Sequence, residues 1–442
     1  MKVFTFIVLN MTKPNIILFI THDQGQFLGC YDTPTTPNSL HTPNLDKLAK
    51  DGILFTDYFC TAPQCSPSRG SIQTSLYPHQ NGLMGLVNLG WTLPPHNKTM
   101  PMYLRENGYT THLLGLQHES VNVKTLGYDT VSKRMKDYKY DTKIMLNEYK
   151  KFFEEHKDDE KPFFANLGVI EIHRPFDVWS EPVDPKTVIV PPFLPESDNI
   201  REDLSLFYGI INPVDETIGK IIEILNDTGL RENTLFIYTT DHGSPFPRAK
   251  CTLYDPGIKT LLVMNCPNNS LVNGGKVLEQ MISNIDLMPT LLDFIEAEIP
   301  ENIEGKSFLS VLKDTNLPFR REIFTEKNYH DIYDPIRSVR TKEYKYIRNF
   351  EPSQYLYNMP IDIERSLSGQ GLKDKIKLKR NKEEFYDLKE DPLEFNNLAY
   401  NPAYNDASLD LRQILHNWMK ETDDPLLKGK IKEEKQKPPK KY

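Results

Sequence analysis

The sequence predicts an α/β fold: a large, doubly wound, mostly parallel sheet flanked by helices, with a smaller C-terminal α+β domain. Three features of the sequence support this prediction. Short continuous apolar runs alternate with amphipathic helical stretches through about residue 315. Two of these runs end in aspartate and histidine, at the edge of a parallel sheet where ligands bind. Beyond residue 315 the strands become half-polar and rich in Tyr and Lys, which is typical of an antiparallel sheet with one exposed face.

The first strand is expected at Asn15–Ile20, where the run NIILFI is bounded by Pro14 and by polar residues. A helix over Asn44–Gly52 follows, because Leu45 and Leu48 share one face and Gly52 ends it. The later expected elements are helix Met100–Gly108, strand Tyr109–Leu114, strand Phe163–Ile170, helix Leu204–Thr228 with Pro213 as a kink position, strands Thr234–Thr240 and Thr260–Met264, and helix Ile285–Ile295.

Strands at Arg337–Arg340, Tyr344–Phe350 and Glu384–Leu388 and a helix at Ser408–Met419 are expected to form the smaller domain, built on an antiparallel sheet. The chain is accordingly divided into an N-terminal extension (1–14), a catalytic domain (15–330), the small domain (331–427) and a basic, solvated tail (428–442).

Charge and apolar patterning exclude two classes of partner. Lys and Arg number 53 against 61 Asp and Glu, a net charge of −8, so nucleic acid is not an expected partner. A membrane span is not expected either, because no apolar run reaches the roughly 18 residues that it needs. Five cysteines without a CxxC spacing argue against a zinc ribbon.

The first residues, Met1–Met11, admit two interpretations. They form a poor signal peptide, or Met11 is the natural start. A bacterial cytoplasm is the favoured location, with the periplasm or secretion as the alternative.

Acidic and imidazole side chains follow two of the strongest strands, as His22-Asp23 and as Asp241-His242. Side chains at the carboxyl ends of parallel strands can converge on a divalent metal, and their oxygen and nitrogen donors suit Ca²⁺ or Mg²⁺, or Mn²⁺ or Zn²⁺. Each aspartate taken alone is also a common helix cap or turn residue.

The segment Cys65-Ser66-Pro67-Ser68-Arg69-Gly70 places an arginine four residues after a cysteine, just where a helical stretch begins. A helix N-terminus and an Arg together bind an oxyanion. Spacing alone also allows a buried cysteine in a proline turn.

Here the sequence resembles the type I sulfatases, whose signature C-x-P-S-R it carries at Cys65–Arg69. The flanking segments agree in order: NIILFITHDQG, then APQ before the signature, SIQTSLYPHQNG after it, and TTDHG later. Segments HQNGLMGL, PFPRAKCTLYDPG and PIRSVR are similar to the sulfamidase (N-sulfoglucosamine sulfohydrolase) branch, and EEFYDLKEDPLEFNNLA is a general sulfatase segment of the small domain.

The resemblance implies that Cys65 is oxidised to formylglycine (3-oxoalanine) by a formylglycine-generating or anaerobic sulfatase-maturating enzyme. One hydroxyl of the aldehyde hydrate attacks sulfur, and the second lets the adduct collapse and eject sulfate. The implied metal site is Asp23, modified Cys65, Asp241 and His242, with His22 as a further ligand and Ca²⁺ as the default ion.

The resemblance also implies roles for other residues. Arg69 orients the formylglycine, Lys250 binds sulfate oxygens, His118 removes the hemiacetal proton, and His173 protonates the leaving group. Residues expected to shape a site for a small sulfated saccharide are Glu326, His330, Arg337 and Arg174. A homodimer is compatible with the resemblance.

Two departures keep alternatives open. Leu116 stands where many sulfatases have Lys, and His22, His242 or Arg174 are candidates to replace that cation. The pair Asp241-His242 also occurs in phosphonate and phosphodiester hydrolases of the same superfamily. The alternatives to a carbohydrate sulfatase or sulfamidase are therefore such a hydrolase, or an inactive relative that binds sulfated glycans.

Overall fold

The computed structural model describes residues 13–433 except Thr36, Asn38, 133–141, Trp179 and Gly371, and gives no side-chain positions for 142–144. The two interpretations of Met1–Met11 and most of the predicted extension 1–14 lie outside these residues, as does the tail from 434 onward.

A nine-stranded sheet forms the centre of the larger domain, in the order β4-β3-β5-β1-β6-β7-β2-β8, with β9 also pairing with β2. Every strand of it runs in one direction except β7, which is antiparallel to both of its neighbours. The strands are β1 (Asn15–Thr21), β2 (Ile53–Phe59), β3 (Thr110–Gly115), β4 (Thr130–Val131), β5 (Phe163–Gly168), β6 (Thr234–Thr240), β7 (Lys259–Asn265), β8 (Lys276–Leu278) and β9 (Ile282–Ser283).

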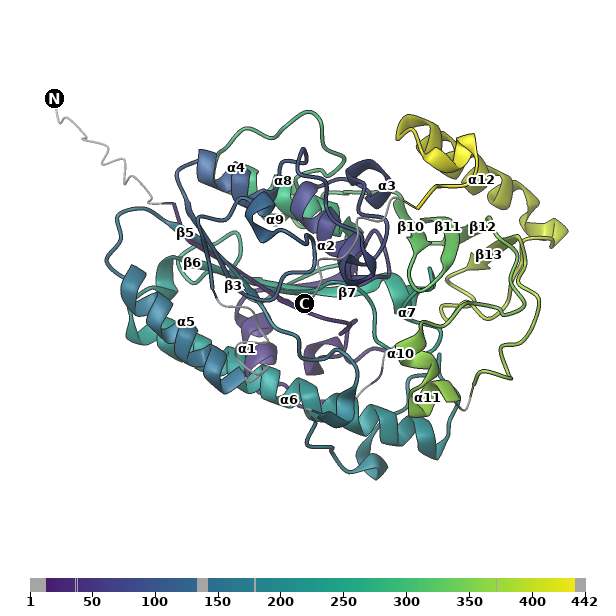
Figure 1. Ribbon diagram of the computed structural model, residues 1–442, viewed down its shortest axis with the longest axis horizontal. Coiled ribbons are helices and arrows are strands. Elements are labelled where there is room, and N and C mark those ends of the chain that lie inside the picture. Colours follow the sequence, from purple (N-terminus) through teal and green to yellow (C-terminus); the bar gives the residue numbers. More distant parts are fainter. Residues whose placement is uncertain are drawn as a thin grey trace.

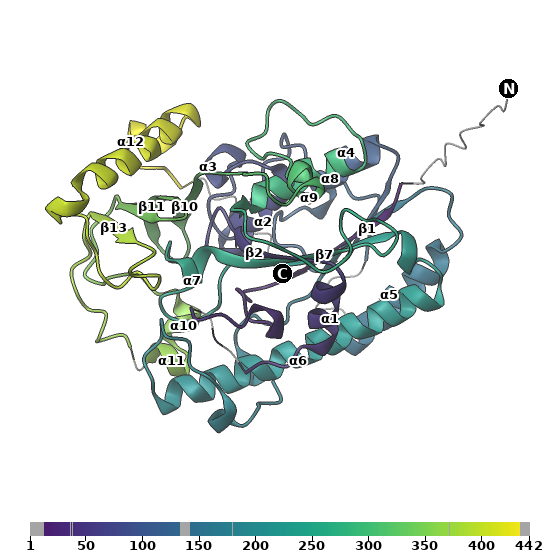
Figure 2. The ribbon, with the colours of Figure 1, turned by 180° about the vertical axis from the view of Figure 1, so that it is seen from behind.

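Helices cover both faces of this sheet, as the alternating pattern predicts (Figures 1 and 2). One face carries α1 (Pro43–Asp51), α5 (Thr142–His156) and α6 (Asp198–Asp227), and the other carries α2 (Cys65–Thr74), α4 (Met100–Glu106), α8 (Leu287–Phe294) and α9 (Leu309–Lys313). Strand β1 shows why both faces are dry: Ile17 and Phe19 join one apolar core, and Ile16 and Leu18 join the other.

The second sheet is antiparallel, four-stranded and ordered β10-β11-β12-β13, and it packs against α12 (Figure 1). Its elements are β10 (Ile323–Tyr329), β11 (Tyr333–Arg340), β12 (Tyr344–Asn349), β13 (Glu383–Asp387) and α12 (Asn405–Glu421); the short helices are α3 (Pro78–Asn81), α7 (Asp255–Ile258), α10 (Ile361–Glu364) and α11 (Leu367–Gln370). The predicted fold class is confirmed.

Two predicted limits differ from the structure. Strand β10 lies inside the predicted catalytic region 15–330 but belongs to the small sheet, because it pairs antiparallel with β11 from Ile323↔Arg340 to Tyr329↔Tyr333. The tail predicted from residue 428 begins as a docked segment: Ile431 is buried, its carbonyl accepts a hydrogen bond from Tyr329, and its amide donates to Tyr333.

Among the longer elements of the large domain, β2 and α5 have no pattern that the sequence analysis identified. Strand β2 follows Gly52 directly and is interrupted by a register shift between Phe55 and Tyr58, which breaks its periodicity. Within the described residues, no helix combines the length and the apolar character that a membrane crossing requires.

A buried charge triad in the small domain gives a pH-dependent prediction. The Asp334 carboxylate pairs with Lys327 and Arg380, each at 2.7 Å, and all three side chains are at most 2% exposed. Burial by itself would raise the pKa of Asp334, but the two cations lower it to about 2. Because this folded-state pKa lies below the unfolded value, the pair stabilises the fold above about pH 4, and the stabilisation is lost as pH falls towards 2.

We therefore expect Asp334→Asn to lower the free energy of unfolding by about 2 kcal/mol or more at pH 7, and by clearly less at pH 3. Urea unfolding at both pH values measures the difference. Asp314→Asn, at a residue in an exposed turn, is the control and should show little effect at either pH. A pH-independent cost at Asp334 would contradict the assignment.

Candidate active site

Four neighbouring parallel strands place four of the candidate residues at one edge of the large sheet. In the spatial order β3, β5, β1, β6, the chain continues beyond each strand to His118, His173, Asp23 and Asp241. The register Thr21↔Thr240 brings the last two ends side by side. Residues far apart in sequence therefore converge because parallel strands all finish at the same edge.

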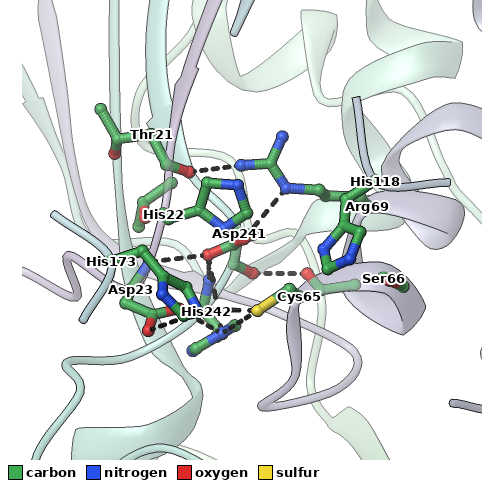
Figure 3. Close-up of polar contacts among 12 residues, drawn as sticks. Thr21, His22, Asp23, Cys65, Ser66, Arg69, His118, His173, Asp241 and His242 are labelled. Carbon is green, nitrogen blue, oxygen red and sulfur yellow. Dashed lines mark hydrogen bonds and ion pairs between the residues drawn. The ribbon is translucent and has the colours of Figure 1, made fainter. Parts of the chain in front are cut away.

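Cys65 is the first residue of helix α2, and its side chain is buried against this edge. Its Sγ lies 3.6 Å from Asp23 Oδ1 and 3.4 Å from His242 Nε2 (Figure 3). Pro67 occupies the first turn of α2, where no intrahelical amide bond is lost. The helix N-terminus thus points the residue-65 side chain into the carboxylate cluster.

Asp23 and Asp241 are held in fixed relative positions by backbone contacts. The Asp23 amide donates to Asp241 Oδ1 at 2.9 Å, and Asp23 itself has a φ of 49°, in the left-handed region. Arg69, 1% exposed, donates from Nε to Asp241 Oδ2 at 3.0 Å and from Nη2 to the Thr21 carbonyl at 2.8 Å. Its Nη1 has no hydrogen-bond partner among the described residues, so one buried donor remains available to an oxyanion.

The two histidines next to these aspartates occupy different environments. His242 Nε2 lies 2.9 Å from Asp23 Oδ1, and although burial would lower the pKa of His242, the carboxylates Asp241 and Asp23 raise it. His22 Nδ1 lies 3.0 Å from Asp241 Oδ2, but burial and Arg69 lower the pKa of His22 to about 4. His22 is therefore neutral at pH 7, which is the form that binds a metal.

Lys250 approaches from the loop between β6 and α7, and its side chain is 1% exposed. The ammonium group lies 2.6 Å from Asp23 Oδ2 and 3.0 Å from Asp362 Oδ2. Burial by itself would lower the pKa of Lys250, but these carboxylates hold it well above its usual value. Lys250 is therefore a permanent cation at the base of the site.

The charges keep Asp23 and Asp241 ionised and Cys65 neutral. Burial opposes ionisation of both carboxyls, yet Lys250 and the neighbouring His242 hold the pKa of Asp23 well below its usual range. His242 and His22, with Arg69, do the same for Asp241. Burial raises the pKa of the Cys65 thiol to about 11, so the unmodified side chain is not a thiolate nucleophile at pH 7.

His118 and His173 differ in their affinity for a proton. Burial, with His22 and Arg69 adding to it, holds the pKa of His118 well below its usual value. Burial and Lys250 also lower the pKa of His173, but Asp23 and a hydrogen bond to Cys65 outweigh them and raise it. The His173 side chain is 31% exposed, whereas the Asp23 side chain is fully buried. His173 Nε2 lies 4.0 Å from Asp23 Oδ2.

The buried cluster has donors that suit a divalent metal. Ligand atoms of His22, Asp23, Cys65 and Asp241 all lie within 4.8 Å of one another. Two ionised carboxylates and a neutral imidazole are a fitting set, and an oxygen at residue 65 would match them better than sulfur for Ca²⁺.

Three residues predicted to contact substrate have polar partners within the fold. Arg337 is 0% exposed and binds Asp424. The fully buried Glu326 carboxylate accepts from the His79 amide at 3.0 Å and contacts the His79 ring. Arg174 forms two hydrogen bonds to Asp203, at 2.7 and 2.8 Å. All three groups therefore have buried partners within the fold, and their contact with a substrate stays a prediction.

The remaining candidate, His330, lines a cavity of about 290 Å³ together with Cys251 and Ile361. It pairs with Asp331 at 3.1 Å, and although burial would lower the pKa of His330, Cys251 and Asp331 raise it to about 9. This cavity contains none of the metal-site residues. A second cavity, of about 750 Å³, lies between the two domains and also lacks them.

The three candidates for the cation missing at Leu116 have different surroundings. Arg174 pairs with Asp203, burial and Arg69 lower the pKa of His22 to about 4, and Asp241 and Asp23 raise the pKa of His242. Replacement of the missing cation by one of them stays a prediction.

Two residues of the site were not among the sequence candidates. Asp362, on α10, binds Lys250, and Glu119 is buried beside His118, whose amide donates to it at 2.6 Å. Burial raises the pKa of Glu119. Glu119 follows a candidate histidine directly and could have been suspected, whereas Asp362 sits in a loop-rich stretch with no distinguishing signal.

This arrangement defines a class of protein: a hydrolase with the α/β fold of the alkaline-phosphatase type, with carboxylates for a metal and buried cations for an oxyanion. A family model described as Sulfatase matches residues 14–297, and one described as N-sulphoglucosamine sulphohydrolase, C-terminal, matches residues 248–365. The chain belongs to the sulfatase family.

The sequences of relatives align with nearly the whole chain. An ulvan-active sulfatase of Formosa agariphila is 31% identical over 95% of this chain and 82% of its own. Human N-sulphoglucosamine sulphohydrolase is 28% identical over 93% and 91%. A solved structure in complex with its substrate D-glucosamine-2-N,6-O-disulfate superposes with a TM-score of 0.70 at 20% identity, covering 93% of this chain and 99% of that one, which shows a shared fold.

Metal binding gives a prediction that does not depend on turnover. We expect Ca²⁺ to raise the melting temperature of metal-free protein, because a ligand present at 100 times its Kd stabilises the folded state by about 2.7 kcal/mol. In Asp241→Asn the shift should be largely lost. In Glu196→Gln, at an exposed residue paired with Arg201, it should be kept. Equal shifts in both variants would place the metal elsewhere.

Proposed function

We propose that this protein is a carbohydrate sulfatase that removes sulfo groups from small saccharides, with N-sulfoglucosamine units as the preferred substrate. The observation that carries the proposal is the buried cluster around Cys65, in which an N-terminal helix residue faces two ionised carboxylates and Lys250. The match of residues 248–365 to the sulphohydrolase C-terminal model supports the N-sulfoglucosamine preference.

In this proposal Cys65 acts as formylglycine, made by a maturating enzyme, and its hydrate supplies the attacking hydroxyl. A divalent ion, Ca²⁺ by preference, would be held by Asp23, Asp241, residue 65 and His22 or His242, and would favour ionisation of that hydroxyl. Arg69 fixes Asp241 and keeps Nη1 for an oxygen of residue 65 or of the sulfo group.

Protons are divided between two histidines. His118, with its lowered pKa, is neutral and able to accept the proton whose loss lets the adduct collapse. His173, with its raised pKa, is the proton donor to the leaving amine or alcohol. Lys250 balances the negative charge of the sulfo oxygens in a site screened from water, where each charge counts more.

The experiment compares four substrates on protein produced together with a maturating enzyme: N-sulfoglucosamine, glucosamine 6-sulfate, a sulfated ulvan disaccharide and a phosphodiester. The mass of the tryptic peptide containing residue 65 verifies the aldehyde in the same preparation. We expect N-sulfoglucosamine to have the highest kcat/KM. A kcat/KM that is orders of magnitude higher for the phosphodiester than for the sulfated sugars would overturn the proposal. Binding without hydrolysis of any substrate would indicate an inactive glycan-binding relative.

A further inference from the structure

Lys250 is shared by two carboxylates that have different surroundings. Its ammonium lies 2.6 Å from Asp23 and 3.0 Å from Asp362, so one cation faces two negative charges. Asp23 is fully buried and also contacts His242, among the candidate metal ligands. Asp362 contacts none of those ligands at hydrogen-bond distance in the described structure. Its ion pair there is with Lys250, and although burial would raise the pKa of its carboxyl, Lys250 and the nearby His173 and His330 lower it.

Asp362 stands on the solvent side of the site. Its side chain is 22% exposed, against 1% for Lys250 and 0% for Asp23. An oxygen of Asp362 lies within 4.8 Å of ligand atoms of Asp23 and His173. Asp362 and His173 therefore lie together on the more exposed side of the site.

The position of Asp362 is fixed by the surrounding structure. The amide of Ile361, one residue before it on α10, donates to Asp331 Oδ2 at 2.8 Å. The amide of Ser368, at the start of α11, donates to Asp203 Oδ2 at 3.2 Å. Asp203 also binds Arg174, the neighbour of His173, so it connects the segment after α10 to the residue beside His173.

We propose that Asp362 is a charge-selecting residue: its carboxylate disfavours dianions in the site, so that a monoanionic sulfo group is accepted and the sulfate dianion produced is released. Coulomb repulsion from a fixed carboxylate is twice as large for a dianion as for a monoanion, and it is weakly screened in a buried site. This inference rests on the proposed function, because it concerns the anion that the same site receives.

The test measures anion binding to Ca²⁺-loaded protein by isothermal titration calorimetry at pH 7.5 and constant ionic strength. The probes are sulfamate, a monoanion, and inorganic sulfate, a dianion. In Asp362→Asn we expect the affinity for sulfate relative to sulfamate to rise about tenfold. Glu364→Gln removes one charge from the same short helix, where Glu364 pairs with Lys373, and should leave the ratio within about twofold of the wild type.

Two further variants keep the result decisive. Asp362→Ser is a second neutral variant in case Asn disturbs α10, and Asp362→Glu keeps the charge and should return the ratio towards the wild-type value. An unchanged ratio in both neutral variants, or an equal change in Glu364→Gln, would overturn the inference. If Asp362→Asn shifts the sulfate-to-sulfamate affinity ratio but the protein hydrolyses no sulfated saccharide, the proposed function alone is contradicted. If the protein hydrolyses sulfated saccharides but the ratio does not shift, the inference alone is contradicted.

Discussion

Replacing Cys65 with alanine is expected to lower kcat for the preferred sulfated saccharide by about 10⁴-fold or more, the range seen when a covalent nucleophile is removed. The thiol is buried among Asp23, His242 and His173, and burial raises its pKa to about 11. Activity therefore depends on conversion of the thiol, and alanine cannot be converted. Cys65→Ser should fail as well, because serine carries one hydroxyl and cannot expel sulfate from the adduct.

The measurement is steady-state kinetics on wild type and variants produced with the same maturating enzyme, together with peptide mass at residue 65. Cys60→Ala is the matched control: Cys60 is also fully buried, five residues earlier, and its thiol faces the Gly257 carbonyl, not the carboxylates. It should keep kcat within a few-fold. Activity of Cys65→Ala above a few per cent of the wild type would remove residue 65 from the chemistry.

Replacing Arg337 with methionine is expected to lower the free energy of unfolding by about 3–5 kcal/mol, because it leaves a buried carboxylate without its partner. Arg337 donates from Nε and Nη2 to Asp424 at 2.6 and 3.0 Å, and from Nη1 to the carbonyls of Lys327 and Ile336. Both charged side chains are 0% exposed. The pair ties the residues after α12 to strand β11.

Urea unfolding measures this cost. The matched control is Arg348→Met: Arg348 is paired with Arg337 in the register of β11 and β12, but its side chain is 47% exposed and 3.8 Å from Glu383. We expect it to cost about 1 kcal/mol or less. Adding Asp424→Leu to Arg337→Met should recover part of the stability. A large rise in KM without loss of stability would restore Arg337 as a substrate-binding residue.

The centre of the site was within reach of the sequence because its residues are tied to strong local signals. Asp23 and Asp241 follow two strongly apolar strands, and parallel topology brings such strand ends together. Cys65 and Arg69 belong to one helical turn, so their relative placement is local. In the structure, Cys65 contacts Asp23 and Arg69 contacts Asp241.

The roles of residues at the rim of the site could not be predicted from the sequence in the same way. A charged residue in a strand of the small domain has the same sequence pattern whether it faces a ligand or a buried counter-charge. Glu326 and Arg337 are of the second kind, and only their partners His79 and Asp424, about 250 and 90 residues distant in the chain, reveal it. Asp362 is the converse: this aspartate on the short helix α10 has no distinguishing sequence signal, and long-range packing brings it to Lys250.

The sequence by itself determined the alternating α/β architecture, the antiparallel second sheet and the residues at the carboxyl ends of the strands, because apolar periodicity and a compact motif are local properties. Tertiary structure alone decided which charges are free. Asp424 neutralises Arg337 and Asp203 neutralises Arg174, while Asp362 shares Lys250 with Asp23. Ion pairing depends on distances of a few ångströms between distant segments, and a buried charge must find its partner wherever the fold places one.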